Sequence, residues 1–148
     1  MPPRKPRHRP LVMVIDESRH TRKELRFYLS NEGYDVEEAA NSHAAFESAS
    51  DESPDLILID LNMPGSSGVL ATQRLRGAAQ LSGVPVVACA GPDSQAYRDA
   101  ARAAGADAYV TKPFNPAVLM RLVRSLLNRR AVGVLPSSDV AQLASMVL

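Results

Sequence analysis

The side chains in this sequence that are best suited to chemistry are three carboxylates and one ammonium group. Asp16, Glu17, Asp60 and Lys112 each stand just after a short apolar run. Converging carboxylates repel one another, and a hard divalent cation such as Mg2+ relieves that repulsion through oxygen ligands. A lysine ammonium beside them lets the same pocket hold a phosphoryl group. The pattern predicts a magnesium site in which Asp60 is the nucleophile for phosphoryl transfer.

Taken singly, each of these residues has a plainer interpretation. An acid at the end of a strand is often a solvated turn residue or a helix N-cap, and a lone lysine is usually a surface charge. The combination is much more specific than its parts. The chain has neither a Gly-x-Gly-x-x-Gly fingerprint nor a Walker-type Gly-Lys-Ser, which argues against nucleotide binding.

The elements that must position these side chains alternate regularly along the chain. Short apolar runs are followed five times by stretches of helical period, which is typical of parallel strands joined by crossover helices. In such sheets ligands bind outside the carboxyl ends of the strands. We expect strands near residues 11–15, 34–39, 56–59, 84–90 and 106–110, with helices before Gly33 and at about 42–50, 69–79, 93–104 and 115–130.

The 148 residues have room for about one domain of ordinary size. We expect a flexible basic arm at 1–10, the domain at 11–130, and a linker at 131–148 that includes a short helix from 137. Because no effector domain fits in the remainder, we expect the domain to stand alone. The arm has no interleaved aromatic residues, so the sequence does not favour nucleic acid as a partner.

The cysteine count and the hydropathy indicate in which cellular compartment the protein is expected. The single Cys89 has no partner for an internal disulfide, and no apolar stretch approaches the roughly 18 residues of a membrane span. We therefore expect a soluble, cytoplasmic protein without a membrane partner.

The chain strongly resembles the response-regulator receiver family over about residues 11–130. The resemblance is carried by Val-Ile-Asp16-Glu17, by Pro54-Asp-Leu-Ile-Leu-Ile-Asp60-Leu-Asn-Met-Pro64-Gly with Gly68 following, and by Gly105-Ala-Asp-Ala-Tyr109-Val-Thr-Lys112-Pro113-Phe114. It implies a flavodoxin-like, doubly wound α/β fold with a five-stranded parallel sheet in the order 2-1-3-4-5 and five helices. That strand order follows from the resemblance and not from the periodicity.

The resemblance also implies a role for each residue of the acid cluster. Asp60 would be the phosphoryl acceptor, and Glu17, Asp60 and the main-chain carbonyl of Asn62 would bind Mg2+. Asp16 would act through metal-bound water. Lys112 would pair with the phosphoryl oxygens, and its peptide bond to the following proline, Pro113, would be cis.

One position departs from the family pattern. Where relatives usually place Thr or Ser at the end of the fourth strand, this chain has Ala90, although the aromatic partner Tyr109 is retained. Alanine cannot donate a hydrogen bond, so a contact worth roughly 1.5 to 3 kcal/mol to a charged acceptor is missing. We expect phosphorylation to survive while its coupling to a conformational switch weakens, so that Tyr109 moves little.

The sequence therefore predicts a single-domain response regulator in a phosphorelay. The donor would be a phosphohistidine on a histidine kinase or phosphotransfer protein, and the output would be contact with a downstream protein target. In this family the helices near 93–104 and 115–130 often form the partner or homodimer surface.

Two other functions compete with this prediction. A degenerate receiver would keep the fold and bind proteins without phosphate, which Ala90 makes reasonable. A phosphatase with an aspartyl nucleophile would need an acid two residues after Asp60, where Asn62 stands, so we do not expect an enzyme that turns over a separate substrate.

Overall fold

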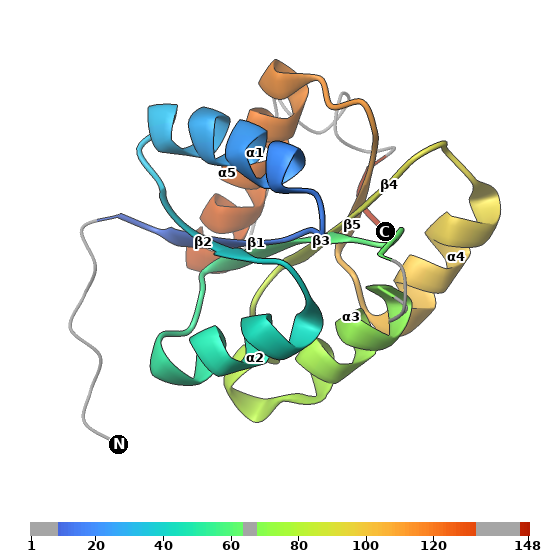
Figure 1. Ribbon diagram of the computed structural model, residues 1–148, viewed down its shortest axis with the longest axis horizontal. Coiled ribbons are helices and arrows are strands. Elements are labelled where there is room, and N and C mark those ends of the chain that lie inside the picture. Colours follow the sequence, from blue (N-terminus) through green and yellow to red (C-terminus); the bar gives the residue numbers. More distant parts are fainter. Residues whose placement is uncertain (1–8, 64–67, 133–145) are drawn as a thin grey trace.

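The protein is a three-layered α/β domain in the computed structural model, which describes residues 9–63, 68–132 and 146–148 (Figure 1). Its five strands are parallel and lie in the order β2-β1-β3-β4-β5, so the expected fold class and strand order are confirmed. The strands are β1 (Leu11–Ile15), β2 (Asp35–Ala39), β3 (Leu56–Asp60), β4 (Val86–Ala90) and β5 (Ala108–Thr111). The helices are α1 (Arg19–Asn31), α2 (Ser42–Asp51), α3 (Gly68–Gly77), α4 (Gln95–Ala104) and α5 (Pro116–Val132), with a short 3-10 turn η1 (Ala79–Leu81).

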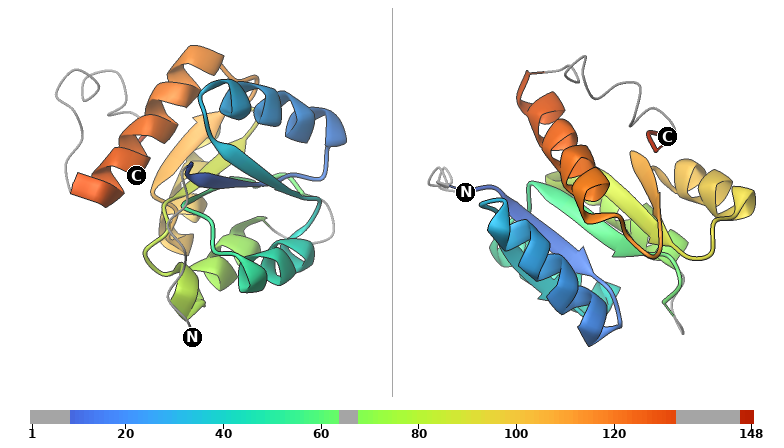
Figure 2. Two further views of the ribbon diagram at one scale, coloured as in Figure 1. Left: turned by 90° about the vertical axis from the view of Figure 1, so that its left-hand side faces the viewer. Right: turned by 90° about the horizontal axis from the view of Figure 1, so that it is seen from above.

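The sheet is covered on both faces, which explains why its central strands are continuous apolar runs. Helices α1 and α5 lie on one face, and α2, α3 and α4 lie on the other (Figures 1 and 2). Side chains alternate between the two faces of β1: Met13 and Ile15 join the core under α2 to α4, whereas Val12 and Val14 join the core under α1 and α5. Every residue of β1, β3 and β4 is buried.

The observed boundaries differ from those predicted at the ends of several elements. β4 and β5 each begin two residues later than expected, because Val84 and Ala106 are buried without belonging to the strand ladders. Burial alone extends an apolar run past the paired residues. The last helix continues to Val132, two residues beyond the expected domain boundary. Residues 1–8 of the basic arm and 133–145 of the expected linker and helix lie outside the described residues.

Residues 146–148 are described, and they are not part of a helix. Val147 forms an isolated antiparallel bridge with Ala108 of the edge strand β5. The short helix expected from 137 therefore does not include these three residues. Their backbone groups pair with the sheet, and an exposed sheet edge favours such pairing.

Arg76 ties the end of α3 to the start of β5. Its guanidinium donates hydrogen bonds to the carbonyls of Ser82, Val84 and Gly105 and to the carboxylate of Asp107, at 2.7 to 3.1 Å. The Asp107 carboxylate also accepts from the backbone N–H of Val86 at 2.8 Å. A planar fork with five donors suits this set of acceptors, and a lysine could not satisfy them together.

Replacing Arg76 by methionine is expected to lower the free energy of unfolding by about 2 kcal/mol, because charge-assisted hydrogen bonds are lost and half-buried acceptors lose their donor. The matched control is Arg102→Met, since the side chain of Arg102 is exposed and lies 3.9 Å from that of Asp99. Urea unfolding of both variants measures the difference. Equal stability of the two variants would show that Arg76 is not a structural tie.

Candidate functional site

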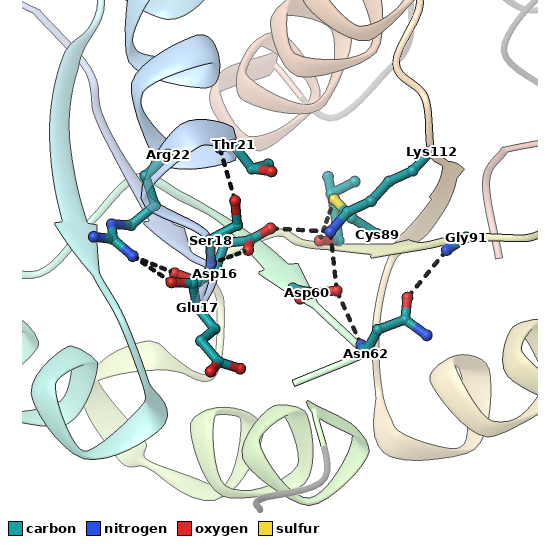
Figure 3. Close-up of polar contacts among 11 residues, drawn as sticks. Asp16, Glu17, Ser18, Thr21, Arg22, Asp60, Asn62, Cys89, Gly91 and Lys112 are labelled. Atoms are coloured by element: carbon teal, nitrogen blue, oxygen red, sulfur yellow. Dashed lines mark hydrogen bonds and ion pairs between the residues drawn. The ribbon is translucent and has the colours of Figure 1, made fainter. Parts of the chain in front are cut away.

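A lysine joins two buried carboxylates at the carboxyl ends of three strands. Asp16 follows β1, Asp60 ends β3, and Lys112 follows β5. The ammonium nitrogen Nζ of Lys112 lies 3.0 Å from Oδ2 of Asp16 and 3.1 Å from Oδ1 of Asp60 (Figure 3). The two acids are separated by 44 positions in the sequence, and parallel pairing of β1 with β3 brings them to one edge of the sheet.

A backbone donor contacts the same Asp60 oxygen that Lys112 contacts. The N–H of Asn62 donates to Oδ1 of Asp60 at 2.9 Å. The loop that carries this donor is held in turn by a backbone hydrogen bond from Leu61 to the carbonyl of Cys89 at 2.8 Å. Asp60 is 6% exposed, so its carboxylate is oriented before any ligand arrives.

Asp16 is oriented in a similar way by the beginning of α1. Its Oδ1 accepts from the N–H of Ser18 at 2.9 Å, and its own N–H donates to the carbonyl of Ala39 at 3.1 Å. Ser18 is the N-cap of α1, and its side chain accepts from the N–H of Thr21. Asp16 is therefore held between the helix start and the end of β2.

The two carboxylates keep Lys112 charged. Burial by itself lowers the pKa of the ammonium group, but the hydrogen bond and charge of Asp16, together with those of Asp60, outweigh burial and raise the pKa above its ordinary value. Lys112 is therefore protonated at neutral pH and offers a fixed positive charge next to Asp60.

Glu17 does not join this cluster. Its side chain is exposed and points away from Lys112 in Figure 3. Among the described residues no group of three or more His, Cys, Asp or Glu side chains is arranged to hold a metal ion. The structure thus brings Asp16 and Asp60 together around Lys112 and places the Glu17 side chain at the surface.

Arg22 holds the backbone of the loop that carries Asp16 and Glu17, the acid loop. The sequence did not predict this role. Its Nη1 donates to the carbonyl of Asp16 at 2.8 Å and to the carbonyl of Glu17 at 2.9 Å, while its Nε lies 3.3 Å from Glu38. Burial raises the pKa of Glu38, but hydrogen bonds from Lys23 and other neighbouring cations outweigh burial and lower it overall. The only sequence signal for this role is an arginine one turn into the helix that follows the acid pair.

Gly68 is required where α3 starts beside the acceptor. A Cβ atom at this position would lie 2.4 Å from the carbonyl oxygen of Asp60 and 2.6 Å from Cα of Leu61. Both neighbours are backbone atoms, so neither can swing aside. The absence of a side chain thus allows α3 to begin against the strand end that carries Asp60.

Asn62 links the two loops that border the site. Its Oδ1 accepts from the N–H of Gly91 at 3.0 Å, and its Nδ2 donates to the Tyr97 hydroxyl at 3.2 Å. The loop after β3 is thereby joined to the loop after β4 and to α4. The side chain of Asn62 has this bridging role, whereas the resemblance had assigned a role to its main-chain carbonyl.

A comparison with known protein families identifies the family to which this chain belongs. The model of the response regulator receiver domain matches residues 12–124. The chain belongs to the response-regulator receiver domain family. Receiver domains are phosphoryl-accepting modules of two-component signalling that interact with histidine kinases and phosphotransfer proteins, and they generally bind Mg2+ at their acidic pocket.

Two curated relatives of this receiver domain are larger proteins. The transcriptional regulatory protein ResD of Bacillus subtilis is 33% identical over 118 residues, which are 80% of this chain and 48% of ResD. The aerobic respiration control protein ArcA of Escherichia coli K12 is 33% identical over 120 residues, which are 81% of this chain and 49% of ArcA. The chain thus spans about half the length of these relatives.

Solved receiver structures have the same fold. The chemotaxis protein CheY4 of Vibrio cholerae is 28% identical with a TM-score of 0.76, and the match covers 80% of this chain and 98% of CheY4. The signal receiver domain of a histidine kinase from Syntrophus aciditrophicus is 27% identical with a TM-score of 0.75, covering 86% of this chain and 96% of that domain.

Within the described residues, no helix is both long and apolar enough for a membrane crossing.

The two residues that were predicted to be switch positions are both buried. Ala90 and Tyr109 are each 0% exposed and belong to the same apolar core. The Arg98 guanidinium carbon lies 4.6 Å from the centre of the Tyr109 ring, a distance at which a cation is attracted to an aromatic face. The Tyr109 hydroxyl is buried and has no hydrogen-bond partner in the described part of the chain; the backbone of Ser94 lies near it without meeting hydrogen-bond geometry.

Two further features of the receiver lie beside the site. The Lys112–Pro113 peptide bond is cis, which is the isomer that the resemblance implies, and the Gly91–Pro92 bond is also cis.

Cys89 is a free, buried thiol, and burial raises its pKa to about 12. A thiol with so high a pKa is almost entirely protonated at neutral pH, so Cys89 is a core residue and not a nucleophile.

Proposed function

We propose that this receiver accepts a phosphoryl group on Asp60 from a phosphohistidine of a kinase or phosphotransfer protein. The observation that carries the proposal is the position of the Lys112 ammonium, which contacts both Asp16 and Asp60 and has a raised pKa. A fixed cation at this point attracts the oxygens of an incoming phosphoryl group and lies directly beside the proposed acceptor.

In the proposed step, Oδ2 of Asp60 forms a bond to phosphorus as the bond between phosphorus and the donor imidazole nitrogen breaks. The imidazole nitrogen keeps the electron pair of the broken bond and takes up a proton from solvent. The Asn62 N–H and the Lys112 ammonium hold Oδ1 of Asp60, which leaves Oδ2 directed to the reaction. This chain supplies the orientation and charge for the step, and the donor supplies the phosphoryl group.

The donor set fits Mg2+ in its chemistry. Asp16 and Asp60 place two carboxylates around one ammonium, so the cluster keeps an excess of negative charge and offers hard oxygen ligands. Asp60, the Asn62 carbonyl and Glu17 would hold the ion, with Asp16 acting through its water, and Glu17 reaches it only if its exposed side chain rotates. When bound, Mg2+ would neutralise charge on the phosphoryl oxygens.

Asp16→Asn is expected to lower Mg2+ affinity about tenfold, because it removes one negative charge from a buried pair of acids. Calorimetric titration with Mg2+ measures the change. The control is Asp51→Asn, which removes the same charge from an exposed position at the end of α2. An unchanged affinity in Asp16→Asn would place the ion elsewhere.

Intact mass tests the proposed function directly. We expect the protein to gain the mass of one phosphoryl group when it is incubated with Mg2+ and a small phosphodonor such as acetyl phosphate. The gain should disappear in Asp60→Asn and fall sharply when Mg2+ is chelated. If the protein without substitutions gained no mass, the result would contradict the proposal and would favour a receiver that binds partners without phosphate.

We also propose that the switch of this receiver is weakened. Ala90 has no hydroxyl to contact the phosphoryl group, and the Tyr109 ring is already fully buried beneath Arg98. A state change can be driven only by contacts that differ between the two states. These same observations support the alternative, a phosphorylation-independent binding module, which the mass experiment separates from the main proposal.

Tyr109 is expected to stay buried whether or not a phosphoryl mimic is bound. Structures determined with and without beryllofluoride and Mg2+ should differ little at the ring, because the ring is already buried and Ala90 has no hydroxyl to contact the mimic. Ala90→Thr supplies a hydroxyl that can contact the mimic, so it tests whether that contact makes the two structures differ. The weakened switch would be contradicted if Tyr109 were exposed in the protein without the mimic and swung fully inward when the mimic was added.

The proposed partners follow from the family and from the faces that the fold exposes. A phosphohistidine donor would approach the edge of the sheet that carries Asp60. The downstream protein target, or a second copy of the receiver, would contact the surface formed by the helices α4 and α5, which correspond to the predicted helices at 93–104 and 115–130.

A further inference from the structure

The outer edge of β5 is occupied by a segment distant in sequence. Residues 146–148 lie beside β5 (Figures 1 and 2), and we call them the 146–148 segment. The N–H of Tyr109 donates to the carbonyl of Met146 at 2.8 Å, and the N–H of Leu148 donates to the carbonyl of Asp107 at 2.9 Å. These bonds flank the bridge between Val147 and Ala108, so the segment pairs as a short antiparallel strand.

The side chains of the segment reach both cores. Met146 packs against the apolar core under α1 and α5, and Leu148 packs against the core under α2 to α4. Backbone pairing combined with apolar side chains at flanking positions is the usual way in which a sheet edge recognises an extended peptide.

β5 can accept such a partner because it ends the sheet. It pairs with β4 on one side only, and its other side would otherwise present the N–H of Tyr109 and the carbonyl of Asp107 without protein partners. Unpaired groups along a sheet edge recruit further strands. The edge of β5 is therefore a template for strand addition.

We propose that this edge is a docking site for an extended apolar peptide strand and that its occupant is the 146–148 segment of the same chain. The attachment is small: three half-buried residues and two backbone hydrogen bonds. So few contacts make the segment exchangeable, since short, exposed pieces of structure open at low free energy. A competing strand from another protein must displace it first.

The site does not depend on phosphoryl acceptance, because it uses only the backbone of β5 and two apolar contacts. It does lie close in sequence to the candidate functional site, since Tyr109 supplies the N–H that binds the segment and Lys112 follows three positions later. Occupancy of the edge fixes the backbone at Tyr109 irrespective of what is bound at Asp60.

Amide hydrogen exchange observed by NMR tests the proposal. In the full chain, we expect the Tyr109 amide to be protected, and deletion of residues 146–148 should speed its exchange about tenfold or more. The Leu58 amide in β3 is the internal reference and should be unchanged. Val147→Ala is the matched control, because it keeps both backbone hydrogen bonds while it shortens the side chain at the bridge.

A synthetic peptide with the sequence of residues 142–148 then tests whether the edge binds a strand supplied in trans. It should restore Tyr109 protection in the deletion variant, whereas the same peptide N-methylated at its last residue should not. The intact chain should bind the peptide more weakly than the deletion variant does. Equal Tyr109 exchange with and without residues 146–148 would overturn the proposal, and so would protection that rises with protein concentration, because the occupant would then come from a second copy.

Discussion

Replacing Lys112 by methionine is expected to slow phosphoryl uptake from a small phosphodonor about 100-fold, the largest effect of any substitution outside Asp60. The ammonium contacts Asp16 and Asp60 at 3.0 and 3.1 Å. Without it, both buried carboxylates lose the cation that they contact, and the incoming phosphoryl group loses the positive charge beside the acceptor. Removing one hydrogen-bond donor that is aimed at charge developing in the transition state typically slows a reaction by about 100-fold to 1,000-fold.

Lys23→Met is the control for this prediction. Lys23 also contacts a carboxylate, Glu38, at 2.8 Å, but it is about half exposed and lies away from Asp60. The time course of phosphorylation followed by intact mass should therefore be nearly normal in Lys23→Met. A Lys112→Met protein that is phosphorylated at the normal rate would show that the ammonium does not assist the transfer.

Gly68→Ala is expected to lower the free energy of unfolding by about 3 kcal/mol and to slow phosphoryl uptake as well. The added methyl would meet the backbone of Asp60 and Leu61 at 2.4 and 2.6 Å, well inside contact distance. Since these atoms belong to a buried strand end, either α3 or the acceptor must shift, and forced overpacking typically costs about 1 to 3 kcal/mol or more.

The other end of the same helix supplies the comparison. At Gly77 a Cβ atom would meet nothing within 4 Å, so Gly77→Ala should be neutral or slightly stabilising. Urea unfolding of the two variants gives the stability difference, and intact mass gives the rate of uptake. If Gly68→Ala were as stable and as readily phosphorylated as Gly77→Ala, close packing of α3 against Asp60 would not be required.

The sequence was sufficient to predict the sheet because burial on both faces leaves a direct trace. The apolar runs that became β1 and β3 end at Asp16 and Asp60, and the short run before Lys112 ends the third strand of the site. Their convergence follows once the strands are parallel. The order of the strands came from the family resemblance, since apolar runs do not specify which strands are neighbours.

The details that the sequence did not predict depend on contacts between distant segments. The exposed orientation of Glu17, the hold of Arg22 on the acid loop and the close approach at Gly68 are set by three-dimensional packing. The pairing of Val147 with Ala108 is another example. A run such as Met146-Val-Leu148 is compatible with a helix or a strand, and only the open edge of β5 selects between them.

The central claim is that Asp60, held between Lys112 and the N–H of Asn62, takes the phosphoryl group. Reduction of the phosphorylated protein with borohydride, followed by peptide mass mapping, tests it most directly, because an aspartyl phosphate is reduced to homoserine whereas a free carboxylate is unchanged. We expect homoserine at position 60 and at no other aspartate. Homoserine at Asp16, or a phosphoryl group that survives in Asp60→Asn, would contradict this account.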